Sequence, residues 1–451
     1  MIFKFYSWYR KALRKSLSGY VIAIGSAFFL STGWMFPEFF VVTWVGWVLF
    51  VGCVFFAKSH GQAFLKGSLI GFATSAIAFY WVPDALKRVY DLSYIMSWFL
   101  YVLMLIWECI PYGILGTLSF FLFYRSPRYL WGVSIGWVGL EYIWPRVFPW
   151  SYAYTQIRFL PLIQLAEIAG SGGISFILIA VSSWIAAFFY SLLANRKLWK
   201  IYTLHLMLGL GMLGGVVSWG FLRLEKWQKS LSQSPFLRVA VIQVDPSYQN
   251  SIKIMYSYSK NVKQEVTLVC WPESTLGTYR LDLYSFQNEG ITQNYSLPPF
   301  VELHPTKGLS AELLAGGRSF SDGATQEGPF YQTAFLVEPD ETIRGRYHKR
   351  ALMPWGEYIP GQDIFPVFRE WIGLADIFIT GDDPTPLELS NGVRVGVLMC
   401  YEDMVPQYAR DSVAAGADVL VSLINGSAFE NPLALEQHFQ LSLLRAVENR
   451  R

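Results

Sequence analysis

The sequence is poor in charged residues, histidine and cysteine, and each shortage argues against a class of protein. Charged residues make up 15% of the 451 residues, against about 25% in an average soluble domain. The net charge of +3 is too small to indicate a nucleic-acid-binding protein. The five histidines include no HExxH motif, and the four cysteines form neither a CxxC pair nor a disulfide framework. We therefore expect no metal, no cofactor and no nucleic-acid partner.

Hydrophobic residues are abundant but unevenly distributed along the chain. They make up 53% of the sequence, and the 18 Trp and 26 Tyr are typical of the aromatic belts at membrane interfaces. The long apolar runs end at about Leu222, and residues 237–451 have the patterning of a soluble protein. We therefore predict a membrane domain over residues 1–235 and a second domain over residues 236–451.

Seven apolar stretches in the first half are candidate transmembrane helices. Most have the roughly 20 residues that a helix needs to cross about 30 Å of hydrocarbon, although the first and the fifth are short. The stretches are residues 20–36, 39–57, 63–83, 95–123, 129–144, 162–193 and 201–222. A cleaved signal peptide is the alternative interpretation of the first stretch, but no convincing small-residue cleavage site follows it before the second.

Lysine and arginine in the connecting loops predict the orientation of the chain. Twelve lie at the N-terminus and in alternate loops, and four lie in the other loops. The twelve are Lys4, Arg10, Lys11, Arg14, Lys15, Lys58, Lys66, Arg125, Arg128, Arg196, Lys197 and Lys200, and the four are Lys87, Arg88, Arg146 and Arg158. Because loops rich in positive charge stay in the cytoplasm, we expect a cytoplasmic N-terminus. Seven crossings then make the second domain extracytoplasmic.

Three glutamates, Glu108, Glu141 and Glu167, lie within or at the edge of these apolar stretches. An ionised carboxylate is costly in hydrocarbon, so such residues need polar partners or a function. They can lie at the interface or form hydrogen bonds between helices. Alternatively, they and the aromatic loop 145–161 shape a lipid-facing cavity. No pair of stretches broken by Gly or Pro suggests the repeat of a transporter.

The second half alternates apolar strands with helices. The predicted strands are 237–244, 266–274, 313–320, 330–340, 393–400 and 418–426, and the predicted helices are 248–264, 406–415 and 434–449. Strands that are apolar throughout are typical of sheets buried on both faces, which favours an α/β layered domain. Glu273 and Cys400 lie at the carboxyl ends of two of these strands, where α/β folds place their chemistry. Taken alone, Cys400 fits a buried structural thiol as well as a nucleophile.

Three segments together resemble the nitrilase superfamily. They are WPE at 271–273, residues 346–361 with Lys349 and Glu357, and MCYED at 399–403. With the membrane half, including FPW at 148–150 and YTQ at 154–156, the sequence resembles more narrowly the apolipoprotein N-acyltransferases, the membrane-embedded branch of that superfamily. The resemblance implies an αββα sandwich in the second domain, and a multi-pass protein of the bacterial inner membrane with a periplasmic catalytic domain.

The resemblance also implies roles for particular residues. Cys400 would be the nucleophile, Glu273 the general base and Lys349 the group that stabilises the oxyanion, and Glu357 would support Lys349. A thiol is mostly protonated at neutral pH and needs a carboxylate to take its proton, and an oxyanion needs a fixed positive donor. The candidate substrate-binding residues are Tyr401, Glu402, Phe429 and Trp355.

The implied reaction is acyl transfer in two steps. A phospholipid, typically phosphatidylethanolamine, would give its sn-1 acyl chain to Cys400 as a thioester. The N-terminal amine of a diacylglyceryl-modified apolipoprotein would then take the chain. The apolar segment 355–371 would touch the bilayer as a gate. The alternatives are a membrane-tethered amidase or nitrilase that uses the same three residues with water as the acceptor, and a transporter or receptor with a non-catalytic domain.

The sequence departs from the family pattern in three places. It has Gly426, Ser427 and Ala428 before Phe429, where the family has Asp and a Trp. Residues 244–251 lack an expected Trp. Family members continue past the region of Arg451 into further strands and an eighth span, so we expect a second domain that is truncated at its C-terminus, with an unpaired sheet edge.

Overall fold

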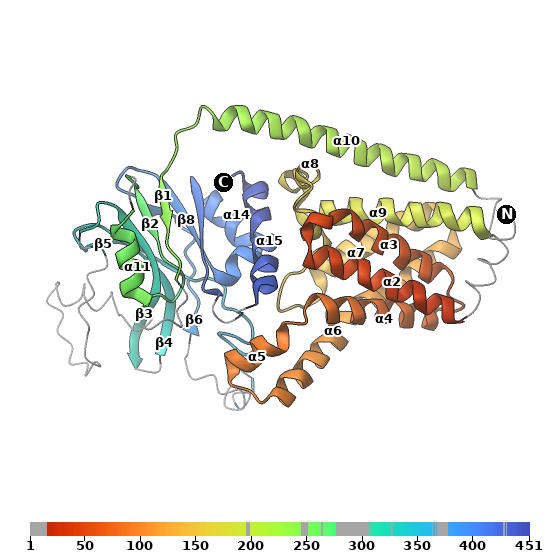
Figure 1. The fold of residues 1–451 in the computed structure, drawn as a ribbon, viewed down its shortest axis with the longest axis horizontal. Coiled ribbons are helices and arrows are strands. Elements are labelled where there is room, and N and C mark those ends of the chain that lie inside the picture. Colours follow the sequence, from red (N-terminus) through yellow and green to blue (C-terminus); the bar gives the residue numbers. More distant parts are fainter. Residues whose placement is uncertain are drawn as a thin grey trace. The chain divides into compact units, whose positions relative to one another are not determined.

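The structure is a computed structural model, and it describes most of the chain. The described residues are 16–194, 199–244, 251–262, 265–276, 306, 308–325, 328–362, 364–365, 367, 378–426, 429 and 431–451. By its contacts the chain divides into two compact units, whose elements are drawn in Figure 1. We call Met1–Lys87, Asp91–Gln233 and Asn431–Arg450 the helical unit, and Arg88–Tyr90, Ser234–Glu430 and Arg451 the sheet unit.

The described part of the helical unit consists of helices, most of them apolar. Its helices are α2 (Ser16–Met35), α3 (Phe40–Phe55), α4 (His60–Ala78), α5 (Val82–Tyr90), α6 (Tyr94–Arg125), α7 (Trp131–Ile143), α8 (Leu160–Ile163), α9 (Ala166–Ala194), α10 (Trp199–Leu231) and α15 (Pro432–Asn449). Three 3-10 helices join them: η1 (Pro37–Phe39), η2 (Pro127–Leu130) and η3 (Tyr152–Gln156).

All seven predicted apolar stretches are helical. Four described helices have the length and composition to cross a membrane: Pro37–Phe55, Tyr94–Arg125, Ala166–Leu193 and Trp199–Leu231. The pair α4 and α5, bent by 61°, makes a fifth if it is one broken span. The two stretches below this length are the first, Gly19–Met35, and the fifth, where α7 has 13 residues.

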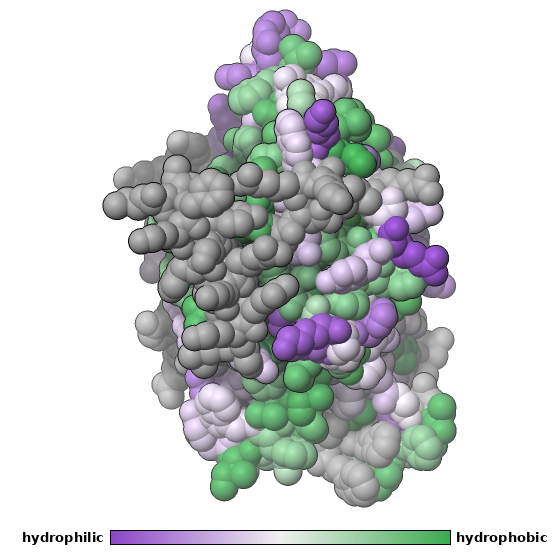
Figure 2. Space-filling view, turned by 90° about the vertical axis from the view of Figure 1, so that its right-hand side faces the viewer, coloured by the Kyte–Doolittle hydropathy of each residue, from purple (hydrophilic) through white to green (hydrophobic). Residues whose placement is uncertain are grey.

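Large apolar side chains of the helical unit are exposed. Ile95 is 85% exposed, Ile143 81% and Met207 66%. Figure 2 shows hydrophobic side chains interspersed with hydrophilic ones on the face turned to the viewer. Soluble proteins rarely expose large contiguous apolar patches, whereas lipid tails cover such side chains favourably. Together with the spanning helices, this makes the chain a membrane protein.

Small residues allow α4 and α6 to pack closely. A Cβ atom added to Gly67 would lie 2.2 Å from the carbonyl oxygen of Tyr112, and one added to Gly116 would lie 2.6 Å from that of Ala63. Helix pairs in membranes pack through such small residues because little hydrophobic driving force is available between helices surrounded by lipid.

Helix α15 follows the last strand in sequence but packs with the helical unit. Gln437 accepts a hydrogen bond from Trp81 Nε1 (2.9 Å) and donates one to the carbonyl of Ala78 (3.0 Å). Arg445 donates to the hydroxyl of Tyr154 in η3 (3.3 Å). The predicted domain boundary between residues 235 and 236 stays a prediction. It was drawn from the hydrophobic pattern of the sequence, whereas the two units are defined by contacts within the structure.

The sheet unit contains two sheets. The first comprises β1 (Val239–Val241), β2 (Leu268–Cys270), β3 (Glu312–Thr325), β4 (Gly328–Val337), β5 (Ile343–His348) and β6 (Phe378–Ile379), in the order β1-β2-β3-β4-β5 with β6 paired to β4. The second comprises β7 (Leu387–Glu388), β8 (Arg394–Met399) and β9 (Val419–Leu423) in that order. Both sheets are mixed, since β1, β2 and β3 run parallel, as do β8 and β9, while β3, β4 and β5 are antiparallel.

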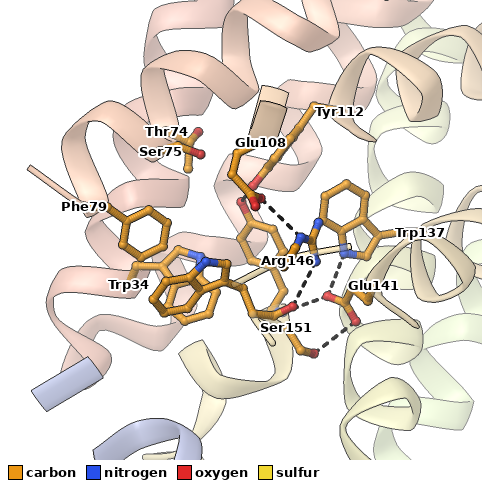
Figure 3. A pocket seen from close by; sticks show the side chains of 12 residues that line it. Trp34, Thr74, Ser75, Phe79, Glu108, Tyr112, Trp137, Glu141, Arg146 and Ser151 are labelled. Carbon is orange, nitrogen blue, oxygen red and sulfur yellow. Dashed lines mark hydrogen bonds and ion pairs between the residues drawn. The ribbon is translucent and has the colours of Figure 1, made fainter. Parts of the chain in front are cut away.

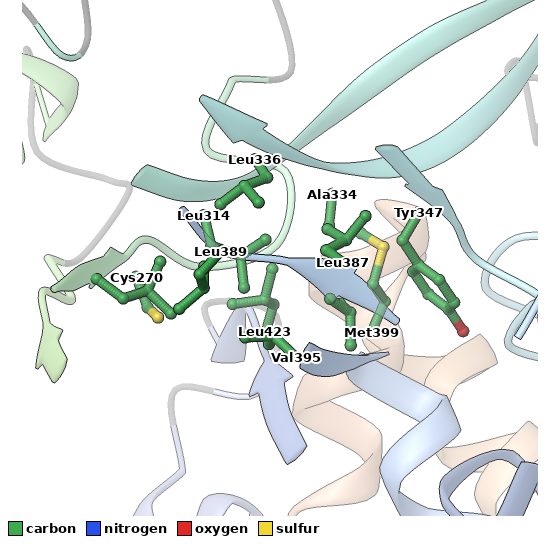
Figure 4. Close-up of a cluster of buried hydrophobic side chains, with 12 residues drawn as sticks. Cys270, Leu314, Ala334, Leu336, Tyr347, Leu387, Leu389, Val395, Met399 and Leu423 are labelled. Atoms are coloured by element: carbon green, nitrogen blue, oxygen red, sulfur yellow. The ribbon is translucent and has the colours of Figure 1, made fainter. Parts of the chain in front are cut away.

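The core of the sheet unit lies on both faces of the first sheet. Along β2 and the residue after it, side chains point alternately into two buried clusters. Leu268 and Cys270 belong to the first cluster, and Val269 and Trp271 to the second. The second cluster also includes Met255 of α11 (Ser251–Lys260). This is the two-residue alternation of a strand. Figure 4 shows the first cluster, in which side chains of β2, β3 and β4 meet those of β7, β8 and β9. The predicted α/β layers are confirmed.

Strands β5, β6 and β7 were not predicted. The residues of β5 alternate between half-buried and exposed positions up to Arg346, only Tyr347 is buried, and the sequence, IRGRYH, is polar. Strands β6 and β7 have two residues each, too few to carry a pattern. They form because partner strands are present, which a single-sequence pattern does not contain.

Candidate active site

Cys400 lies at the turn between β8 and the short helix η5 (Cys400–Met404). Five successive residues of β8, Val395–Met399, are buried, so the strand is fixed up to the residue before the thiol. Cys400 has a φ of 48°, a left-handed conformation that costs a non-glycine residue energy and persists only where the surroundings enforce it. The cysteine itself is half-buried. A strained turn therefore presents the thiol at the carboxyl end of a strand.

Lys349 follows β5 and is held between two carboxylates. Its Nζ donates to Glu273 Oε1 (2.9 Å) and to Glu357 Oε1 (2.8 Å). Lys349 is 1% exposed and Glu273 6%. The other oxygen of Glu357 accepts from the backbone N–H of Met353 (2.7 Å), which fixes this carboxylate in turn. The structure thus brings Glu273, Lys349 and Glu357 together.

Glu273 is placed by a turn directly after β2. Ser274 has a φ of 59°, and Thr275 Oγ1 donates to the carbonyl of Pro272 (2.7 Å). Strand β3 passes close to this turn at Gly316, where an added Cβ would lie 2.6 Å from Glu273 Cα. Only glycine fits that approach, so Gly316 supports the site, although no motif in the sequence predicts such a role.

The charges of the site keep Cys400 protonated at rest. Burial and the negative charge of Glu273 raise the pKa of the Cys400 thiol well above its usual value, and Lys349 opposes them only partly. Burial alone would lower the pKa of Lys349, but Glu273 and Glu357 outweigh it and hold that pKa well above its usual value. Two carboxylates and one ammonium leave a net charge of −1, which disfavours a thiolate. The thiol therefore needs a base before it can act as a nucleophile.

Glu402 does not lie where a substrate-binding residue is expected. It is 0% exposed, and its carboxylate accepts hydrogen bonds from the backbone N–H groups of Met399 (2.7 Å), Arg350 and Ala351 (3.2 Å) and from the hydroxyl of Tyr347 (2.9 Å). A carboxylate has about four acceptor positions, and here the protein fills them. The substrate-binding role of Glu402 stays a prediction, and this geometry favours a structural role.

The other predicted substrate-binding residues are Tyr401, which follows Cys400, Trp355 and Phe429. Tyr401 is half-buried, and burial raises its pKa to about 12. Trp355, two residues before Glu357, is 41% exposed and has a φ of 68°. The backbone N–H of Phe429 donates to the carbonyl of Gly426 (3.0 Å). Their contacts with substrate stay a prediction.

Two family models match the sequence. A carbon-nitrogen hydrolase model matches residues 238–451, and a model of the apolipoprotein N-acyltransferase N-terminal domain matches residues 26–184. The chain belongs to the apolipoprotein N-acyltransferase family. The predicted resemblance and fold class are thereby confirmed.

Individual relatives are consistent with this assignment. The apolipoprotein N-acyltransferase of Geobacter metallireducens is 29% identical over 96% of this chain and 82% of its own length. That of Bdellovibrio bacteriovorus is 25% identical over 88% of this chain and 74% of its own. One similar solved structure is that of Saccharomyces cerevisiae Nit3, a member of branch 10 of the nitrilase superfamily. It is 18% identical, with a TM-score of 0.33, over 48% of this chain and 72% of its own. This likeness is too small to add to the family matches.

Tyr347 and Arg350 hydrogen-bond to Glu402 beside the site but were not predicted. Arg350 directly follows Lys349, and Tyr347 of β5 is two residues before it, the separation that places side chains on one face of an extended chain. That spacing was the available signal.

Among the described residues, no group of three or more His, Cys, Asp or Glu could hold a metal.

In the helical unit of this N-acyltransferase, Glu108 and Glu141 line one pocket. Glu108 accepts a hydrogen bond from Arg146 (3.2 Å), and their side chains are 9% and 5% exposed. Arg146 also donates to the carbonyl of Trp150 (3.1 Å). Glu141 accepts from Trp137 (2.7 Å), from Ser151 (3.0 Å), from the backbone of Tyr152 (2.8 Å) and from Ser175 (3.1 Å), and Figure 3 shows most of this network.

Each of the three membrane glutamates has protein partners. The pocket beside Glu108 and Glu141 has a free volume of about 20 Å³, room for about one water molecule. Glu167 lies elsewhere, where it accepts from Arg223 Nε (2.9 Å) and pairs with Arg450. These contacts favour the hydrogen-bonding interpretation of the three glutamates over a lipid-facing cavity.

The pH dependence of Cys400 alkylation tests the electrostatics of the site. Because the charge of Glu273 raises the pKa of the thiol and that of Lys349 lowers it, Glu273→Gln should move the alkylation midpoint to lower pH and Lys349→Met to higher pH. Iodoacetamide labelling, read at the Cys400 peptide by mass spectrometry, measures both midpoints. An upward shift in Glu273→Gln, or no shift in either variant, contradicts the assignment.

Proposed function

We propose that this chain transfers an acyl chain from a phospholipid, through a thioester on Cys400, to the N-terminal amine of a diacylglyceryl-modified apolipoprotein. The observation that carries the proposal is a buried lysine held between two carboxylates beside a strained cysteine, in a chain that also has a membrane unit. A general base, an oxyanion donor and a nucleophile are the three groups that acyl transfer requires.

In the first step the donor ester acylates Cys400. Glu273 takes the thiol proton as Sγ attacks the sn-1 carbonyl carbon, and Lys349 stabilises the oxyanion that forms there. The bond from that carbon to the glycerol oxygen then breaks, and the glycerol oxygen receives the proton from Glu273. The products are a lysophospholipid and an acyl thioester. Glu357 orients Lys349 throughout, since it binds the same ammonium.

In the second step the apolipoprotein amine attacks the thioester carbonyl. A second oxyanion forms at the same position, and Glu273 takes a proton from the amine. The carbon–sulfur bond breaks, the sulfur recovers a proton, and the new bond is an amide. The same three side chains therefore serve both steps, and no redox or metal chemistry is needed to balance them.

The proposal includes a location and a domain arrangement. The chain is a multi-pass protein of the bacterial inner membrane, with its N-terminus in the cytoplasm and its catalytic domain, residues 236–451, in the periplasm. The distribution of twelve against four positive residues supports this orientation. The lipid bilayer, a phospholipid donor and an apolipoprotein acceptor are the proposed partners.

Among the described residues, a cavity is lined by the neighbours of Glu273 but not by Glu273, Lys349 or Cys400 themselves. Its volume is about 370 Å³, within the range of small-molecule sites. The lining includes Pro272, Ser274 and Thr275 from the turn that carries Glu273, together with Arg318 of β3. Hydroxyls and a guanidinium are suited to a phosphodiester or a peptide backbone.

Transient acylation of Cys400 tests the proposed function. Membranes incubated with labelled phospholipid should yield a protein-bound label that hydroxylamine removes, and Cys400→Ala should abolish it. Cys109→Ala, which removes a partly exposed thiol of the helical unit, is the matched control and should keep the label. A membrane-tethered amidase predicts no label from phospholipid, so an unlabelled intact protein would favour that alternative.

Exposed apolar residues after Glu357 are the candidate gate. Ile364 is 74% exposed and Phe365 55%, whereas Phe368 lies outside the described residues. Phe365→Asp should slow acylation of Cys400 from vesicles, because a charge opposes contact with the bilayer, and should leave acylation by detergent-dispersed donor unchanged. Phe236→Asp, at a 77% exposed position, is the control. Equal rates from vesicles in Phe365→Asp and the intact protein would remove the gate from the proposal.

A further inference from the structure

Glu402 is the centre of a buried hydrogen-bond network that joins two segments of the active site. Its Oε2 accepts from the backbone N–H of Met399 (2.7 Å). Its Oε1 accepts from the backbone N–H groups of Arg350 and Ala351 (3.2 Å). The hydroxyl of Tyr347 lies 2.9 Å from both oxygens. One side chain therefore binds three backbone groups and one phenol.

The backbone groups that Glu402 binds are next to the two key residues. Met399 immediately precedes Cys400, and Arg350 immediately follows Lys349. Glu402 is 52 residues from Arg350 in sequence, so no local turn fixes this spacing. The carboxylate connects the turn that carries the nucleophile to the strand end that carries the oxyanion donor.

A carboxylate is the side chain that this position requires. Burial raises the pKa of Glu402, but hydrogen bonds from the backbone of Met399 and Arg350 oppose that rise. Backbone N–H groups can only donate, and an ionised carboxylate can only accept, so all four bonds are complementary. A glutamine of the same size would direct its NH₂ group at one of these donors and leave it unsatisfied.

The network is anchored beyond Glu402. Arg350 Nε donates to the hydroxyl of Tyr347 (3.2 Å), and its other nitrogens bind Asp411 (3.3 Å) and the carbonyl of Tyr408 (3.0 Å). Both lie in α14 (Pro406–Ala414), the helix that follows η5. This anchoring explains how the left-handed conformation of Cys400, φ 48°, can persist against its cost.

We infer that Glu402 is a positioning residue that sets the place of Cys400 relative to Lys349 and does not bind substrate. It acts on both steps of the reaction, because both oxyanions form at the same position. The two steps are those of the proposed function, on which this part of the inference rests. The position of the thiol is inferred from the hydrogen-bond geometry alone.

Glu402→Gln tests the inference. The rate of each step is divided by the number of protein molecules whose Cys400 can be alkylated, which exhaustive alkylation measures. The single-turnover rates of thioester formation and of transfer to the amine should both fall, by about 10²-fold for a displacement near 1 Å, while KM for the phospholipid stays within about twofold. Tyr347→Phe removes one of the four donors and should show a smaller decrease in both steps, which keeps the test valid if Glu402→Gln does not fold.

The possible results separate the roles. A raised KM with an unchanged single-turnover rate would mean that Glu402 binds substrate and would overturn the inference. Unchanged rates per site in both variants, with only fewer folded molecules, would reduce Glu402 to a stabilising residue and also overturn it. Glu338→Gln is the matched control, since Glu338 is a partly exposed carboxylate of the same unit that pairs with Arg344.

Alkylation distinguishes this inference from the proposed function. If the intact protein forms no acyl thioester, the proposed function fails, but iodoacetamide labelling of Cys400 needs no lipid and still reports the thiol's surroundings. Glu402→Gln should then shift the pH midpoint of labelling from that of the intact protein, because the thiol moves relative to the charges of Lys349 and Glu273. An unchanged midpoint in that experiment overturns the inference.

Discussion

The ion pairs of Lys349 with Glu273 and Glu357 are the interaction on which the rest of the active site depends. A buried ammonium without partners would lose its proton or destabilise the fold, and the two carboxylates prevent both. They exceed the lysine by one negative charge, so the nearby thiol stays protonated until a base removes its proton. In the proposed mechanism the same arrangement supplies that base, Glu273, and the positive donor for the oxyanion, Lys349.

The sheet unit fixes these groups from separate strands. Glu273 follows β2, Lys349 follows β5 and Cys400 follows β8, and each lies in or beside a turn whose geometry the core enforces. Left-handed backbone at Ser274, Trp355 and Cys400 accompanies the site, and such strain is typical of functional positions. The close approach at Gly316 and the carboxylate of Glu402 supply the supporting contacts that hold the turns in place.

The residues of the site could be predicted from sequence to an unequal extent. Glu273, Lys349 and Cys400 could be proposed because each stands in a distinctive motif at the end of a strand, and the structure brings the first two into contact. The positioning role that we infer for Glu402 could not, since its partners are mostly backbone N–H groups brought together only by the tertiary fold. The apolar helices could be predicted because their signal is local composition. The pairing of Glu108 with Arg146 and the packing of α15 could not, because they depend on contacts between distant segments.

The most direct test of the central claim is the single-turnover rate of thioester formation in Lys349→Met, compared with the intact protein at equal numbers of alkylatable Cys400. If Lys349 stabilises the oxyanion, the rate should fall by about 10²–10³-fold, the usual effect of removing one such donor, while the thiol still reacts with iodoacetamide. A rate within a few-fold of the intact protein would contradict the claim, because the buried ammonium would then have only a structural role.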